Sequence, residues 1–402
     1  MTESGKGHGP LRILMVAACP LPWPRGTPIR IRRLAESLAK AGHEVEVATY
    51  HLGRRDQETQ GVRVHRIEDV PGYTKTAPGP TVGKILRLDP RLRRLVTGLT
   101  RSRRFDLIHA HHYEGLWAAG GAPAGTPVIY DAHTTLAGEL PDYRLPVPRF
   151  VLRTLGAWAD ARLPRRAQAV VAVSESIRDT LIRLGAAEHV VVIPNGVDWD
   201  LFADLDGTPE ASEVVMFTGN LAAYQGIDLL LRAFARTLSL RPSARLAIVT
   251  DGAFDSYEPL AVRLGIRDSV DIVRAPFNEQ PRLLRQARVA VSPRKVCDGV
   301  PQKLLNYMAS GAAVVAFEGS AAHIEDGRTG RRIPDGDVDE MGRVIADLLT
   351  QPERAQALGR AARSEIQAGY TWGRMADRLV RFYEGVLRAR KTGVAELSSA
   401  AT

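Results

Sequence analysis

SPRKVCDGVPQKLLNYMASG, residues 292–311, is the stretch that decides the predicted fold of this chain. The apolar run RVAVS that leads into it predicts a short buried strand. Asp298 and Gly299 break that strand, and Pro301 stands where the first turn of a helix accepts a proline. Leucine, methionine and alanine then recur at helical spacing, which predicts one buried face. The stretch therefore predicts a strand, a turn and a helix inside an α/β domain.

The polar residues of this stretch favour an anionic sugar ligand. Lys303 lies in the first turn of the predicted helix, where free backbone N–H groups and a positive side chain attract phosphate. Asp298 comes just before the helix, and a carboxylate at that place can hold sugar hydroxyls. Together they indicate a sugar-diphosphate site. A capped core helix with an incidental lysine is the alternative for this stretch alone.

Length and composition allow a two-domain chain with anionic partners. The chain has 402 residues, of which 45% are hydrophobic, and this length favours two domains. A net charge of +9 suits nucleotides, a lipid surface or nucleic acid, and charge alone does not choose among them. Cys19 and Cys297 lie far apart in the sequence, so neither a disulfide framework nor a cysteine metal cluster is expected. We expect a cytoplasmic protein that is soluble or peripheral at the inner face of a membrane.

Predicted strands and helices alternate in two series. One series begins with the strand at 11–18 and the other with the strand at 214–220. Such alternation predicts two doubly wound Rossmann-like α/β domains that face each other across a cleft, with ligands at the carboxyl ends of the strands. The predicted parts are an N-terminal domain over 1–202, a polar linker over 203–213, a C-terminal domain over 214–370, a helix over 371–392 that crosses back toward the first domain, and a tail over 393–402.

One group of candidate residues follows the first strand of the predicted N-terminal domain. Arg25, Gly26 and Thr27 lie close to a helix start, where backbone amides can approach a phosphate. The loop lacks G-x-G-x-x-G, so a dinucleotide site is poorly supported, and a proline-stiffened connection is the alternative.

Histidines end two other strands of that domain. His109, His111 and His112 end the strand at 105–115, and His133 ends the next. These histidines could line one ligand cleft. Metal binding is the alternative, but no matching acidic ligand cluster is evident in the sequence.

Residues 84–104 form a basic amphipathic segment. They carry eight Lys or Arg against one Asp, and Leu92, Leu95, Val96 and Leu99 fall on one stripe of a helix that Pro90 can begin. Such a helix can lie on an anionic membrane surface. The arginine-rich stretch 144–166 would extend that surface if it folded alongside. A solvated helix face is the alternative interpretation.

Taken in order, several stretches of the chain resemble one enzyme family. They are AGHEVEVAT, VVAVSESIRDTLIRLG, VVVIPNGVDWDLF, and the run from FTGN through YQGIDLLLRAF to EDGRTGRRIPDGD. The chain resembles the GT-B-fold retaining glycosyltransferases of family 4, within a branch marked by GN-x3-YQGIDLL, SPR, P-x-KL and YMASG. The resemblance implies a nucleotide-diphosphate sugar donor on the C-terminal domain and an acceptor on the N-terminal domain. It also implies retained anomeric configuration, with no cofactor and no obligatory metal.

The implied donor site departs from the family pattern at four positions. The family has an arginine and a lysine where this chain has Asn220 and Gln225, and both family residues hold the donor diphosphate. It also has two glutamates where this chain has Asp298 and Asn306. Lys303, with Arg294, is expected to supply the lost positive charge. The other implied donor-binding residues are Gly219, Asp251, Gly299, Val300 and Pro301, added to Arg25, Gly26 and Thr27.

The resemblance also implies a catalytic set and leaves two other functions open. His111 would lie near the reacting sugar and the acceptor, Asp298 would bind donor hydroxyls, and Lys303 would stabilise the leaving diphosphate. His133 would lie on the acceptor side. A GT-B-like sugar-nucleotide epimerase is one alternative, and a catalytically weakened nucleotide-sugar-binding protein is another. Nucleic-acid binding is not expected, because the basic residues lack interleaved aromatics.

Overall fold

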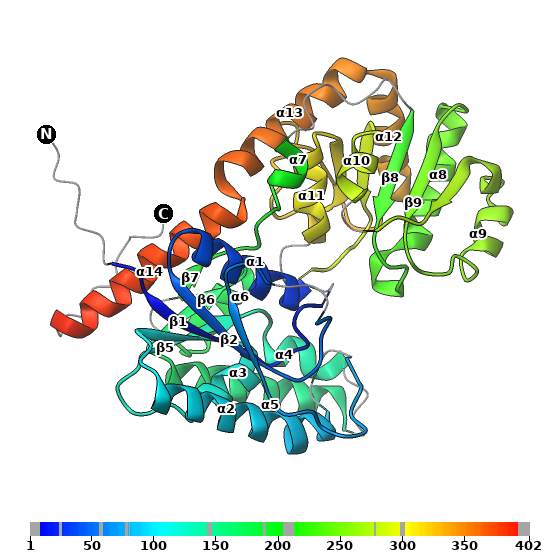
Figure 1. Ribbon diagram of the computed structural model, residues 1–402. Coiled ribbons are helices and arrows are strands. Elements are labelled where there is room, and N and C mark those ends of the chain that lie inside the picture. Colours follow the sequence, from blue (N-terminus) through cyan, green and yellow to red (C-terminus); the bar gives the residue numbers. More distant parts are fainter. Residues whose placement is uncertain are drawn as a thin grey trace, which may run out of the picture. The chain divides into compact units, whose positions relative to one another are not determined.

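A computed structural model of the chain shows two compact units, each built on its own parallel sheet (Figure 1). The first unit comprises Met1–Asn195 and Trp372–Thr402, and the second comprises Gly196–Thr371. The structure describes residues 9–23, 26–55, 59–76, 79, 81–142, 147–187, 190–203, 213–276, 279–297 and 302–392.

The first unit holds a seven-stranded sheet in the order β3-β2-β1-β4-β5-β6-β7, with every pair parallel. Its strands are β1 (Arg12–Ala17), β2 (Glu44–Thr49), β3 (Arg63–Arg66), β4 (Leu107–His111), β5 (Val128–Ala132), β6 (Ala169–Ala172) and β7 (Val190–Val192). Its helices are α1 (Gly26–Lys40), η1 (Lys84–Leu88), α2 (Asp89–Ser102), α3 (His112–Ala119), α4 (Leu136–Glu139), η2 (Leu140–Asp142), α5 (Arg149–Arg162), η3 (Pro164–Arg166), α6 (Glu175–Arg183) and α14 (Trp372–Thr392).

Both faces of the sheet are buried at its centre, which explains why β1 reads as a continuous apolar run. Alternate residues of β1 enter two different cores, Leu14 and Val16 on one face and Ile13 and Met15 on the other. Helices α2, α3 and α6 line the first of these cores. Helices α1 and α14 line the second. The last helix of the chain is therefore part of the first unit.

The second unit repeats this plan with a six-stranded parallel sheet in the order β10-β9-β8-β11-β12-β13. Its strands are β8 (Val214–Thr218), β9 (Arg245–Val249), β10 (Val270–Val273), β11 (Val289–Ser292), β12 (Ala313–Phe317) and β13 (Arg331–Ile333). Its helices are α7 (Asp200–Ala203), η4 (Ala223–Gln225), α8 (Ile227–Leu240), α9 (Glu258–Arg263), η5 (Arg267–Ser269), α10 (Gln280–Leu284), α11 (Gln302–Ser310), η7 (Glu318–Ser320), α12 (Val338–Thr350) and α13 (Pro352–Gly369).

The strand orders locate the ligand edge of each unit. In both sheets the direction of winding reverses beside the first strand of the unit, between β1 and β4 and between β8 and β11. Open α/β sheets bind ligands outside the carboxyl ends of the strands at such a reversal. The predicted doubly wound architecture is confirmed for each unit.

The change from one unit to the other comes earlier than the sequence predicts. Residues 196–203 already belong to the second unit, because the amide of Val197 donates to the carbonyl of Tyr370 over 2.8 Å. Arg363 likewise donates to the carbonyl of Phe202 over 2.7 Å. Most of the predicted linker, 204–212, lies outside the described residues. The boundary at residue 202 is therefore corrected to residue 195.

The amphipathic stripe of α2 faces the protein interior. Leu92 and Val96 are 0% exposed and Leu99 is 9% exposed, in the same core as β1 and β4. The helix therefore cannot present this stripe to a membrane, whereas Ile85 and Leu86 of the same basic segment are exposed. The membrane surface predicted for residues 84–104 stays a prediction. Within the described residues, no helix combines the length and apolar character needed to cross a bilayer.

Candidate active site

The second unit brings several predicted donor-binding residues to the carboxyl ends of β8 and β11. Gly219 follows β8 with φ 128°, and a Cβ atom there would lie 3.3 Å from Nζ of Lys303. Gly226 ends η4 with φ 72°, and its Cβ would lie 2.3 Å from the carbonyl oxygen of Pro293. Both positions need glycine because their φ angles are positive, and at Gly226 a Cβ atom would also meet the backbone of Pro293.

Lys303 contacts one of the two positions where the family pattern has lost its cations and is connected through it to the other. Its Nζ donates to Oε1 of Gln225 over 2.5 Å. Nε2 of Gln225 donates in turn to Oδ1 of Asn220 over 3.4 Å. The two amides and the lysine therefore form one connected chain. The spacing of the α11 sequence predicts the first-turn position of Lys303, whereas the contact with Gln225 comes from the fold.

The charge on Lys303 is held in a poorly solvated place. Burial, together with the smaller effect of the nearby positive charge of Arg294, lowers the pKa of Lys303 to about 7. Nζ also lies 4.2 Å from the centroid of the Phe217 ring. Among the residues that the structure describes, no carboxylate pairs with Nζ of Lys303, and an ammonium group in so poorly solvated a place gains strongly from an anionic ligand.

The remaining predicted residues of the second unit take different positions. Arg294 is half-buried, and its guanidinium carbon lies 5.0 Å from the Tyr224 ring centroid. Asp251 is exposed just after β9, and Asn306 is 8% exposed in α11. The predicted residues outside the described part of the chain are Arg25, Asp298, Gly299, Val300 and Pro301.

The first unit places the start of α1 beside the end of β4. Gly26 is the exposed first residue of α1, and Oγ1 of Thr27 lies 3.0 Å from Nε2 of His112. His112 has φ 61°, which is unusual for a residue with a side chain. Its ring stacks on that of His133 with centroids 4.5 Å apart. Three of these residues come from sequence prediction, and His112 belongs to the histidine run named there.

Behind this group lies a buried ion pair that sequence reasoning missed. Arg30 of α1 donates to both carboxylate oxygens of Asp131, from Nε over 3.0 Å and from Nη2 over 3.3 Å. The same guanidinium donates to the carbonyls of Ile193 and Pro194 and to Oδ1 of Asn195. Both charged side chains are almost completely buried, at 2% and 0% exposure. The five N–H groups of the guanidinium therefore meet five hydrogen-bond contacts.

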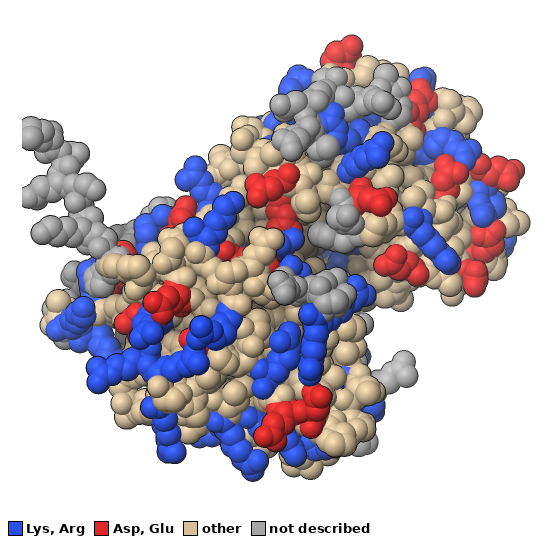
Figure 2. Space-filling model, in the orientation of Figure 1, with Lys and Arg blue, Asp and Glu red and all other residues tan. Residues whose placement is uncertain are grey.

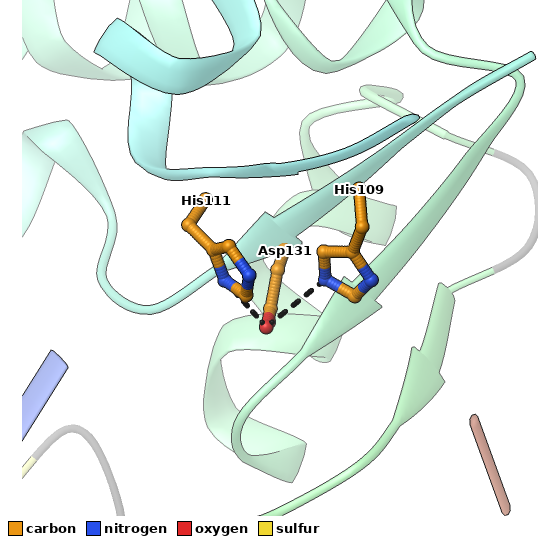
Figure 3. A group of neighbouring side chains, drawn as sticks. All are labelled: His109, His111 and Asp131. Atoms are coloured by element: carbon orange, nitrogen blue, oxygen red, sulfur yellow. Dashed lines mark ion pairs between the residues drawn. The ribbon is translucent and has the colours of Figure 1, made fainter. Parts of the chain in front are cut away.

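Three histidine nitrogens converge on the same carboxylate oxygen. Oδ2 of Asp131 lies 3.3 Å from Nε2 of His109 and 3.2 Å from Nδ1 of His111, as Figure 3 shows. It also lies 3.4 Å from Nε2 of His133. His109 is held from the other side by the hydroxyl of Tyr383 in α14.

The charges in this cluster are fixed by burial and by Arg30. Burial lowers the pKa of His111 well below 6.5, and burial lowers the pKa of His133 to about 4. Burial alone would raise the pKa of Asp131, but Arg30 and the histidines hold it well below 3.8. The cluster at neutral pH is therefore an Arg30–Asp131 ion pair with His111 and His133 neutral.

The cluster has the ligand types of a metal site, but its carboxylate is already paired with a buried cation. His109, His111 and Asp131 place one ligand atom each within 4.8 Å of one another, so the acidic partner that the sequence did not reveal is present. However, Arg30 already engages both oxygens of that carboxylate. A second cation would face the guanidinium at close range. The group is better explained as a buried ionic network that orients the strand ends.

The structure changes which histidine a ligand can reach. His111 is 0% exposed and belongs to the buried network, and His133 is 9% exposed. His112 is half-buried beside Thr27 and the exposed Gly26. Within the described part of the first unit, His112 is therefore more accessible to a ligand than His111. The catalytic role of His111 stays a prediction.

The neutral histidines predict that acid destabilises the first unit. Because the pKa of His133 falls from about 6.5 in the unfolded chain to about 4 in the folded one, only the unfolded chain gains this proton between those pH values. Folding stability should therefore be full above about pH 6.5 and fall by about 3 kcal/mol toward pH 4. Urea unfolding across this pH range should show that the free energy of unfolding of His133→Gln falls less steeply than that of the wild type. His51→Gln is the matched control. Equal slopes for the wild type and His133→Gln would contradict this assignment.

Comparison with known protein families agrees with these two units. The family model described as Glycosyltransferase Family 4 matches residues 24–201, and the model described as Glycosyl transferases group 1 matches residues 212–351. The chain is 29% identical over 399 residues to a phosphatidyl-myo-inositol mannosyltransferase of Mycolicibacterium smegmatis, covering 94% of each protein. It is 27% identical over 405 residues to a D-inositol 3-phosphate glycosyltransferase of Segniliparus rotundus, covering 90% of this chain and 85% of the relative.

Solved structures show the same fold. Sucrose-phosphate synthase from Thermosynechococcus elongatus superposes with a TM-score of 0.75 at 20% identity, covering 95% of this chain and 100% of that one. Anabaena Alr3699/HepE, solved in complex with UDP and glucose, superposes with a TM-score of 0.69 at 18% identity, covering 92% and 98%. With two glycosyltransferase family models along its length and GT-B enzymes as structural neighbours, the chain belongs to the family 4 glycosyltransferases of GT-B fold.

Proposed function

We propose that this enzyme transfers a hexose from a nucleoside-diphosphate sugar to an acceptor hydroxyl, retaining the anomeric configuration and requiring no metal ion. One observation carries the proposal for the donor. Nζ of Lys303 lies 2.5 Å from Oε1 of Gln225, so a cation from α11 reaches the position where the family pattern has a lysine, and Gln225 connects it to Asn220, where the pattern has an arginine. The diphosphate site is therefore rebuilt with its positive charge on another element.

The relatives and neighbours support this donor class. A phosphatidyl-myo-inositol mannosyltransferase shares most of the length of this chain, and the Alr3699/HepE structure contains UDP and glucose. By extension, a nucleoside diphosphate is the leaving group proposed for this chain. The proposed acceptor is a hydroxyl compound that binds the first unit near Thr27 and His112, with His133 behind His112.

The proposed chemistry is chiefly electrostatic. The bond from the anomeric carbon to the β-phosphate oxygen breaks, the acceptor oxygen bonds to the same carbon, and the hydroxyl proton passes to the departing phosphate. Negative charge therefore grows on the diphosphate while positive charge grows on the sugar. Lys303 is poorly solvated, and in its protonated form it favours the separated diphosphate more than the bound donor. Asp298 is assigned to the sugar hydroxyls and Asn306 to the ribose.

A donor screen tests the proposal without knowledge of the acceptor. Purified full-length chain is incubated with single nucleotide sugars, and release of nucleoside diphosphate is measured. We expect slow hydrolysis of one donor, accelerated by the true acceptor. An isomerised sugar nucleotide without diphosphate release would identify an epimerase.

The four altered positions favour one further candidate, a binding protein with weakened catalysis. Asn220, Gln225, Asp298 and Asn306 replace two cationic and two glutamate positions of the family pattern. Tight binding of a nucleotide sugar with neither hydrolysis nor transfer, across the whole donor screen, would support this candidate and reject the transferase.

A further inference from the structure

The outer face of α5 exposes bulky apolar side chains. Phe150 is 73% exposed, Leu155 is 54% exposed and Trp158 is 57% exposed. Phe150, Thr154 and Trp158 are spaced four residues apart, so they form one ridge along the helix. The buried residues of the same helix are Leu152, Gly156 and Asp160. The helix therefore reverses the usual pattern, with its larger apolar groups in solvent and a carboxylate inside.

Packing inside the unit fixes this reversed orientation. Both oxygens of Asp160 accept from the start of α4, from the amides of Leu136 and Ala137 over 2.9 Å each. The hydroxyl of Tyr113 also donates to Asp160. A Cβ atom at Gly156 would lie 2.5 Å from the amide nitrogen of Ala137. Because only a small residue and an acceptor fit beneath α4, α5 cannot rotate to bury Phe150 and Trp158.

Positive charge surrounds the ridge. Arg149, Arg153 and Arg162 are exposed on α5, and the guanidinium carbon of Arg162 lies 4.8 Å from the Trp158 ring centroid. All residues of α5 are described, and none of its exposed ones is acidic. Figure 2 shows many Lys and Arg side chains over the visible surface of the first unit. An apolar ridge bordered by arginines is complementary to a surface that is apolar within and anionic at its edge.

We propose that this outer face of α5 docks on an anionic lipid bilayer. Phe150 and Trp158 enter the boundary between headgroups and acyl chains, and Arg149, Arg153 and Arg162 meet the lipid phosphates. Nucleic acid would leave the apolar ridge in water. A second copy of the face would set arginines against arginines without an acidic side chain from α5 to offset them. This assignment makes no use of the buried stripe of α2, and it does not depend on the donor or the reaction.

Vesicle flotation of the full-length chain tests the proposal. The chain is mixed with vesicles of phosphatidylcholine alone or of equimolar phosphatidylcholine and phosphatidylglycerol. We expect recovery with the anionic vesicles, weakening as salt is raised, and little recovery with the neutral ones. The double variant Phe150→Ser/Trp158→Ser should partition at least about tenfold less, because two large apolar groups no longer enter the bilayer. The control is Val262→Ser in α9, which removes an equally exposed apolar group, 59% exposed, from the second unit.

A second double variant, Arg153→Gln/Arg162→Gln, tests the role of the positive charge. It should bind the anionic vesicles more weakly than the wild type, and its binding should depend less on salt. Recovery of the double serine variant equal to that of the wild type would overturn the proposal. So would failure of the wild type to float with the anionic vesicles, or a wild-type dimer that Phe150→Ser/Trp158→Ser converts to a monomer. Diphosphate release in the absence of vesicles is measured in parallel, so failure of membrane docking is distinguished from failure of the transferase.

Discussion

Replacing Lys303 with methionine is expected to lower kcat/KM for the nucleotide-sugar donor by about a hundredfold, which corresponds to about 3 kcal/mol of lost transition-state stabilisation. Methionine keeps an unbranched apolar side chain at this position and removes the charged nitrogen that lies over the Phe217 ring. Neither Asn220 nor Gln225 can replace that charge, because both are neutral amides. The loss should appear mainly in kcat, since the charge on the departing diphosphate is greatest in the transition state.

The pH dependence separates this role from a structural one. Because burial lowers the pKa of Lys303 to about 7, the free enzyme must take up a proton to bind a diphosphate at higher pH. Affinity for a nucleoside diphosphate should therefore weaken by up to about tenfold per pH unit above about pH 7. Lys303→Arg keeps its charge and should flatten that profile. Lys391→Met, at an exposed lysine of α14, is the control. An unchanged kcat/KM in Lys303→Met would remove Lys303 from the mechanism.

The sequence predicts the α/β architecture well because strands and helices each produce a recognisable pattern of apolar residues within a short stretch of sequence. Strands buried on both faces read as apolar runs, and helices show their own period, so both doubly wound units follow from the alternation. The position of Lys303 on α11 follows in the same way. Its hydrogen bond to Gln225 joins residues 78 positions apart and depends on how β8 lies beside β11. Only the folded sheet brings them together.

Two helices show that an amphipathic pattern does not by itself predict which surface the apolar face of a helix contacts. The stripe on α2 is a real apolar face, but periodicity does not tell whether that face meets the core or a membrane. Helix α5 is harder to read, because Asp160 is buried to accept hydrogen bonds from α4. The position of a partner more than 20 residues earlier in the chain decides which face is inside. The acidic partner of the histidines was missed for a related reason, since Asp131 reads as an ordinary residue within a strand.

Replacing Arg30 with methionine is expected to destabilise the first unit by about 3–5 kcal/mol, the cost of leaving a buried carboxylate without its cation. Asp131 is 0% exposed, and Arg30 engages both of its oxygens. The change also leaves the carbonyls of Ile193 and Pro194 without the hydrogen bonds that the guanidinium donates. Urea unfolding at neutral pH measures the loss. The matched control is Arg12→Met, which breaks an exposed pair with Glu44 and should change the stability far less, because solvent screens that pair.

A double-mutant cycle and a pH series show whether the uncompensated charge causes the loss. Asp131→Asn in the Arg30→Met background removes that charge and should recover part of the stability, so the two changes should not add. In the wild type the ion pair holds the pKa of Asp131 well below 3.8, so its contribution is complete above the unfolded pKa and is lost as pH falls. Without Arg30 the pKa of Asp131 should rise, so the deficit of Arg30→Met should be largest at neutral pH and shrink toward acid. A deficit independent of pH, or one no larger than that of Arg12→Met, would mean that Arg30 stabilises the unit by packing rather than by neutralising Asp131.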